Sequence, residues 1–187
     1  MAITDLAGFV TQLKDHAVEH GFHIHDERHF VESYSLRQSW EVDLHPENAC
    51  NGPLDIHIAL EVDPRTLLNF EDAVVAMNED AEPPEGFDLE LTINWSLPPV
   101  TETVDLLRLT LDLAGFGGMD LPIEVSAVDS YPSVTDAPSR RLGVVGKYKV
   151  SLARIYLGEE VACEILDKTT PVSNFLLEQA GQWSSPS

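Results

Sequence analysis

The sequence contains few cysteines, few basic residues and no long apolar run. Two cysteines among 187 residues exclude a framework of several disulfides, and we expect both Cys50 and Cys163 to be free thiols. No apolar stretch approaches the length of a membrane span, and the first residues carry neither the basic region nor the apolar core of a signal peptide. These absences predict a soluble, cytoplasmic protein without membrane contact.

Several common catalytic motifs are also missing. The sequence has no CxxC pair, no GxSxG nucleophile elbow and no HExxH zinc motif. Residues 143–147 lack the glycine spacing and the Ser or Thr of a P-loop, and residues 115–118 lack the third glycine of a dinucleotide-binding fingerprint. None of these chemistries therefore has support in the sequence.

Acidic residues, by contrast, are abundant. The chain holds 32 Asp and Glu against 11 Lys and Arg, a formal net charge of -21. Residues 1–130 contain 26 acids and five Lys or Arg, whereas residues 131–187 contain six of each. A body this negative repels nucleic-acid phosphates and anionic lipids, so we exclude nucleic acid and membrane as primary partners. It attracts basic proteins and cations, although a negative surface also serves solubility alone.

Alternation of apolar and polar residues organises the chain. Residues 34–44 and 54–62 carry apolar side chains at even positions, and residues 87–97 carry them at odd positions. Because successive side chains of a strand point to opposite faces, each stretch predicts a strand with one buried and one wet face. The turn-forming residues 45–53 favour antiparallel pairing of the first two strands.

We predict a single α+β domain over residues 1–181 and a disordered tail over 182–187. Its mixed, mainly antiparallel sheet has about six or seven strands, with helices packed on one face. The predicted helices span 3–20, 64–78, 101–114 and 170–181. The predicted strands span 22–25, 34–44, 54–62, 87–97, 121–127, 144–157 and 161–166. Turns are predicted at 26–28 and 158–159, and a long loop at 129–143.

Histidines gather in the first third of the chain, where all seven occur. On the predicted helix, His16 and His20 are four residues apart and share a face, while His23 and His25 would point to one side of a strand. The stretch 16–20 reads HAVEH, the inverted HxxEH order of some zinc peptidases. A polar helix end without a metal explains the same pattern, because a cationic imidazole suits the negative end of the helix dipole. The candidate ligands for zinc or a similar divalent metal are His16, Glu19, His20, His23 and His25.

A second candidate pair is His45 and Cys50, which share one predicted loop. A thiol beside an imidazole is the arrangement of a nucleophile and its base. Nothing in the sequence orients the two groups, so an incidental loop thiol is the simpler interpretation.

Two functions from different classes fit these features. We favour a non-enzymatic, acidic binding or regulatory domain of the chaperone, adaptor or inhibitor type, which engages a basic protein partner through the polar sheet face. The alternative is a metal-dependent enzyme, a hydrolase, that uses the N-terminal His and Glu residues. Self-association is a further expectation, in which the basic stretch 147–154 meets the acidic face of another copy. The candidate binding residues are Glu41, Asp43, Asp55, Glu61, Asp88 and Glu90.

Overall fold

The computed structural model describes residues 4–78, 80–101, 103–131, 133–134 and 138–183. Its strands are β1 (Phe22–Val31), β2 (Gln38–Pro46), β3 (Asp55–Val62), β4 (Asp88–Ser96), β5 (Ile123–Ser130) and β6 (Ser139–Ser151). Its helices are α1 (Leu6–Glu19), α2 (Pro64–Ala76), α3 (Leu106–Gly117), α4 (Leu152–Leu157) and α5 (Val161–Trp183), with a 3-10 turn η1 (Glu47–Ala49).

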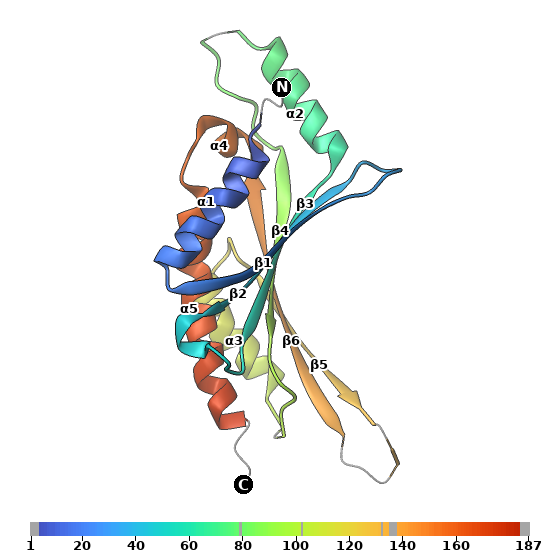
Figure 1. Cartoon of the computed structure of the whole chain (residues 1–187), viewed down its shortest axis with the longest axis vertical. Coiled ribbons are helices and arrows are strands. Elements are labelled where there is room, and N and C mark those ends of the chain that lie inside the picture. Colours follow the sequence, from blue (N-terminus) through green and yellow to red (C-terminus); the bar gives the residue numbers. More distant parts are fainter. Residues whose placement is uncertain (1–3, 79, 102, 132, 135–137, 184–187) are drawn as a thin grey trace.

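The six strands form one sheet with helices along one of its faces. The strand order is β1-β2-β3-β4-β6-β5, and all neighbouring pairs are antiparallel. Helices α1, α3 and α5 lie along one face, and α2 lies beyond one end of the sheet (Figure 1). The predicted α+β class with a largely antiparallel sheet is therefore confirmed.

The core lies between the sheet and these helices, as the alternation predicts. On β3, Ile56, Ile58 and Leu60 are buried while the residues between them are partly or fully exposed. Trp95 of β4 crosses the core, where its Nε1 donates to the Ser173 Oγ of α5 over 2.9 Å. Burial of these side chains is the main stabilising contribution, because each removes a large apolar area from water.

The first strand is longer than the sequence predicts. β1 runs through residues 26–28, where a turn was expected, because Arg28 pairs with acids on its own and the neighbouring strand. The turn instead lies at 33–37, so Tyr34 and Leu36 leave the predicted strand and are exposed. Charged residues within β1 therefore mark a paired strand rather than a loop.

The C-terminal third contains helices where two strands were predicted. β6 ends at Ser151, and Leu152–Leu157 forms α4, which Gly158 closes with a left-handed φ of 72°. Residues 161–166, predicted as a strand, begin the 23-residue helix α5, and Pro171 lies inside this helix rather than at its start. The apolar positions of α5 repeat at helical spacing over its whole length, which decides the structure once α5 packs on the sheet.

The end of the chain also differs from the prediction. Gln182 and Trp183 belong to α5, and Trp183 is buried, so the predicted tail begins too early. The predicted loop 129–143 is too long, because residues 129–130 belong to β5 and residues 139–143 to β6. Residues 132, 135–137 and 184–187 lie outside the described residues. None of the helices in the described ranges has the length and apolar content needed to cross a bilayer.

Candidate metal centre

The histidines predicted to form one cluster occupy two separate places. From α1, His16 Nδ1 lies 2.6 Å from Cys163 Sγ, and His20 Nε2 lies 3.1 Å from Asp167 Oδ1, both on α5. Burial raises the pKa of the Cys163 thiol, and nearby acids, including Glu19, raise it further. Among the described residues, these α1 groups do not join the β1 histidines in a group with metal-binding geometry.

A compact donor cluster forms instead from β1, β2 and the turn that follows β2. Cys50 Sγ lies 3.2 Å from both His45 Nε2 and His23 Nδ1. The three ligand atoms all lie within 4.8 Å of one another. Imidazole nitrogen and thiolate sulfur are the donors that zinc and related transition metals prefer.

A second group of donors shares His45 with the first. His25, His45 and Asp55 also have their ligand atoms within 4.8 Å of one another. His25 Nε2 contacts His45 Nδ1, so the two nitrogens of His45 face different neighbours. His45 is therefore the centre of the whole arrangement.

Local backbone structure explains why these residues meet. The β1–β2 register places His23 opposite His45, and a bulge between Ile24 and Asp26 gives His25 an irregular position in the ladder. The turn η1 then folds the chain back, which returns Cys50 to His45. This turn is tight, because a Cβ at Gly52 would lie only 2.8 Å from a backbone oxygen in η1.

The environment of His45 favours a neutral imidazole. His45 is only 6% exposed. Burial lowers the pKa of His45, and the neighbouring His25 and His23 lower it further. Since a metal binds the unprotonated nitrogen, a lowered pKa keeps this ligand available near neutral pH.

A hollow of about 360 Å³ adjoins the second donor group. His25 and Asp55 lie on its wall together with His57, Asp43 and Ser96. A small polar molecule in this hollow would therefore meet imidazole and carboxylate groups of the second donor group and its neighbours.

The six acids predicted as binding residues lie on β2, β3 and β4, and some are already paired. Arg28 Nη1 lies 2.7 Å from Asp43 Oδ2, and its Nη2 lies 3.2 Å from Glu41 Oε2. Burial alone would raise the pKa of Asp43, but hydrogen bonds from His57 and Arg28 outweigh it and hold this pKa below its ordinary value. Lys147 lies 3.3 Å from Glu90.

The other three acids have fewer charged neighbours. Glu61 accepts a hydrogen bond from Ser39 Oγ over 3.2 Å, and Asp55 belongs to the second donor group. Asp88 makes no ion pair within the described part of the chain. All six side chains share the sheet face opposite the buried one, since strand partners keep the same alternation.

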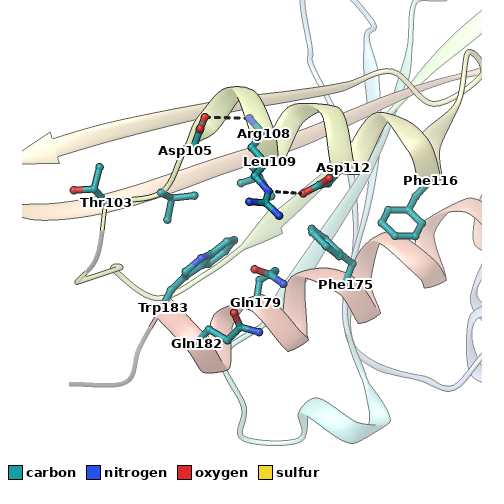
Figure 2. Close-up of a pocket in the computed structure, with 11 residues that line it drawn as sticks. Thr103, Asp105, Arg108, Leu109, Asp112, Phe116, Phe175, Gln179, Gln182 and Trp183 are labelled. Atoms are coloured by element: carbon teal, nitrogen blue, oxygen red, sulfur yellow. Dashed lines mark hydrogen bonds and ion pairs between the residues drawn. The ribbon is translucent and has the colours of Figure 1, made fainter. Parts of the chain in front are cut away.

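A separate hollow of about 530 Å³ lies between α3 and α5. Figure 2 shows Phe116 and Phe175 at one end of it and Trp183 at the other. Arg108 and Asp112 approach each other to 3.9 Å on its rim. No His or Cys is among the described residues that line this hollow, so they offer no soft metal ligands.

Comparisons with protein-family models, curated proteins and solved structures find no match to this chain. The functional argument therefore rests on the geometry of the donor cluster.

Sequence reasoning found part of this cluster. It singled out His23 and His25 as ligands and noted His45 with Cys50 as a pair, but it did not connect the two sets. The missing information was the β1–β2 register, which a correct placement of the turn at 33–37 would have supplied.

Proposed function

We propose that the protein binds a zinc-type transition-metal ion through His23, His45 and Cys50. The observation that carries the proposal is the convergence of three suitable donor atoms, with nitrogen–sulfur separations of 3.2 Å. Bond lengths of about 2.3 Å to sulfur and 2.0–2.1 Å to nitrogen imply an edge of about 3.6 Å in a tetrahedral site. A small outward movement of the side chains would accommodate the ion.

Neighbouring groups support the same assignment. Glu47 Oε1 lies 3.6 Å from His23 Nε2, the nitrogen that would not bind the metal. His25 contacts His45 Nδ1, which is likewise the nitrogen that would not bind the metal. Metal-ligating imidazoles usually have such a partner on their second nitrogen, because it fixes the tautomer and the ring orientation.

Three protein ligands leave a fourth tetrahedral position for water. This is the arrangement of zinc sites that activate water, whereas purely structural sites use four protein ligands. This open position supports metal-dependent hydrolysis as the activity, and the hollow lined by His25 and Asp55, which neighbour His45, offers space for a small substrate nearby. The ligand set differs from the α1-centred one predicted from the sequence.

The test measures metal binding by the full chain and by two matched cysteine variants. We expect one tightly bound Zn²⁺ per wild-type chain, and with Co²⁺ an absorption band from the cobalt–thiolate bond. Cys50→Ser should abolish this band and weaken binding at least about 10-fold. Cys163→Ser should change neither result, although Cys163 also lies beside a histidine.

Two results would overturn the proposal. One is unchanged Zn²⁺ affinity in Cys50→Ser. The other is loss of the cobalt–thiolate band in Cys163→Ser, which would place the metal between α1 and α5. Because the two variants carry the same net charge, the general attraction of an acidic protein for cations does not affect the comparison.

The acidic sheet face supports a second candidate, a binding domain for a basic protein partner. The supporting observation is that six acids share one face that α1, α3 and α5 leave uncovered (Figure 1). The double variant Glu61→Gln and Asp88→Asn should weaken binding of an oligolysine peptide several-fold at low salt. The control is Asp15→Asn with Asp72→Asn, which removes the same charge from helices. Equal weakening by both pairs would mean that net charge alone matters.

A further inference from the structure

The strand β5 forms one end of the sheet and has a free backbone edge. Among the described residues it pairs only with β6, and Pro122 O accepts a hydrogen bond from Lys147 N. Backbone groups alternate in direction along a strand, so the N–H and C=O groups of Val125 and Ala127 face away from β6. An unpaired row of this kind is a ready template for another strand.

Helix α3 presents exposed leucines next to this edge. Leu107 and Leu111, one helical turn apart, are 71% and 65% exposed. Figure 2 shows Arg108 and Asp112 on the side of α3 that faces α5. Because consecutive helical residues are about 100° apart, Leu107 and Leu111 are turned away from this side and from the buried Leu109 and Leu113, so they face away from α5.

The core side of β5 is not fully covered by α3. The side chains of Val125 and Ala127, on the core side of β5, are only half-buried although they pack against the core. The half-burial means that α3 does not fully cover them, and a second apolar surface would complete their burial.

The opposite end of the sheet is protected in a way that β5 is not. β1 carries three consecutive charged residues, Asp26–Arg28, and a bulge, two features that discourage strand addition, whereas the charged residues of β5, Glu124 and Asp129, are separated by four others. The ladder of β5 with β6 is regular from Ile123 to Ser130. The two ends thus differ in the features that govern edge pairing.

We propose that a second copy of this chain docks at the β5 edge, forming a two-fold symmetric dimer. In this dimer β5 pairs antiparallel with β5 of the second copy, and the α3 leucines of the two copies come together on the core side. An antiparallel strand pair is compatible with two-fold symmetry, because each strand presents the same groups to the other.

Charge complementarity selects the second copy as the occupant. Within the described residues neither Glu124 nor Arg141 makes an ion pair. Suppose that Ser126 lies opposite Ser126 of the second copy. Glu124 then lies opposite Val128 of the second copy, and within that copy Val128 pairs with Arg141 on β6. Glu124 and Arg141 of the second copy are therefore separated by two strand spacings, about 10 Å between backbones, which their long side chains can span. The symmetry repeats this pair on the other side of the axis.

The first experiment measures molar mass of the full chain by light scattering or sedimentation over a range of concentrations. We expect a mass twice that of the chain and slower amide exchange at Val125 and Ala127 as concentration rises. The N–H of Ser126 bonds to β6, so its exchange provides the internal control. A monomer at every concentration would overturn the proposal.

Variants then locate the interface. Leu107→Glu should weaken the dimer at least about tenfold, and Leu68→Glu, at a comparably exposed leucine of α2, should not. Ala127→Pro should also prevent dimerisation, because it removes an N–H that faces the free edge and leaves the β6 ladder intact. Arg141→Glu should weaken the dimer, and Glu124→Arg in the same chain should restore it. A dimer that tolerates both Leu107→Glu and Ala127→Pro would contradict this interface.

Salt distinguishes this dimer from one in which the basic stretch 147–154 meets an acidic face. Raising the ionic strength from about 0.1 M to about 1 M shortens the Debye length from about 10 Å to about 3 Å. Repulsion between two chains of net charge -21 is then screened, so an apolar dimer at β5 should persist or tighten. Dissociation at high salt would overturn the β5 assignment and support the electrostatic one.

Discussion

Replacing Glu47 with Gln should lower the affinity of the protein for Zn²⁺ by about 10- to 100-fold, the usual effect of losing a partner of a metal-ligating histidine. Glu47 Oε1 lies 3.6 Å from His23 Nε2, too far for a hydrogen bond but close enough for its negative charge to favour a proton on Nε2, which leaves Nδ1 free for the metal. The amide of Gln keeps the size of the side chain but removes the negative charge, so the imidazole becomes a weaker ligand. Titration with a competing chelator measures the change.

Glu19→Gln is the matched control for this prediction. It makes the same substitution on α1, next to the HxxEH stretch, and removes the same charge. We expect the Zn²⁺ affinity of this variant to equal that of the wild type. If Glu19→Gln weakened binding and Glu47→Gln did not, the ion would belong with His16 and His20 rather than with His23 and His45.

Alternation was a reliable guide to the central strands because burial there has a period of two. Along β3 and β4, each second residue from Ile56 to Val62 and from Leu89 to Trp95 is buried. One sheet face packs on helices and the other meets water, so the sequence pattern carries the structure directly.

The C-terminal third could not be read in the same way. The alternation of buried residues in β6 continues to Leu152, so the start of α4 resembles more strand. With six residues, α4 has fewer than two helical turns and is too short to show a helical period. In α5, Pro171 suggested a helix start, although it lies in the middle of the helix. The gain from packing a long apolar face outweighs the hydrogen bond that a proline removes.

The candidate metal centre was only partly predictable for a related reason. Spacing along the chain identifies neighbours on one helix, and this favoured His16 with His20. Contacts between strands depend on register, and the pairing of His23 with His45 follows from a turn whose position the alternation misplaced. The return of Cys50 to His45 depends on η1, which left no periodic signal.

Trp95→Ala should lower the free energy of unfolding by about 3–5 kcal/mol, the range typical of removing a large aromatic side chain from a core. Trp95 is 2% exposed, and its ring lies so close to β6 that a Cβ at Gly146 would come within 3.0 Å of it. Its Nε1 donates to Ser173 Oγ over 2.9 Å, which ties the sheet to α5. The substitution leaves a cavity and breaks this connection at once. Urea unfolding with an unchanged m-value would measure the loss.

Trp40→Ala is the matched control, because the same atoms are removed from a different environment. Trp40 is half-buried on β2, where its ring stacks on His29 with centroids 3.7 Å apart. Its Nε1 has no hydrogen-bond partner among the described residues. Less apolar area returns to water and no hydrogen bond is lost, so the expected cost is about 1–2 kcal/mol. Equal losses at the two positions would contradict the role given to Trp95 as the link between the sheet and α5.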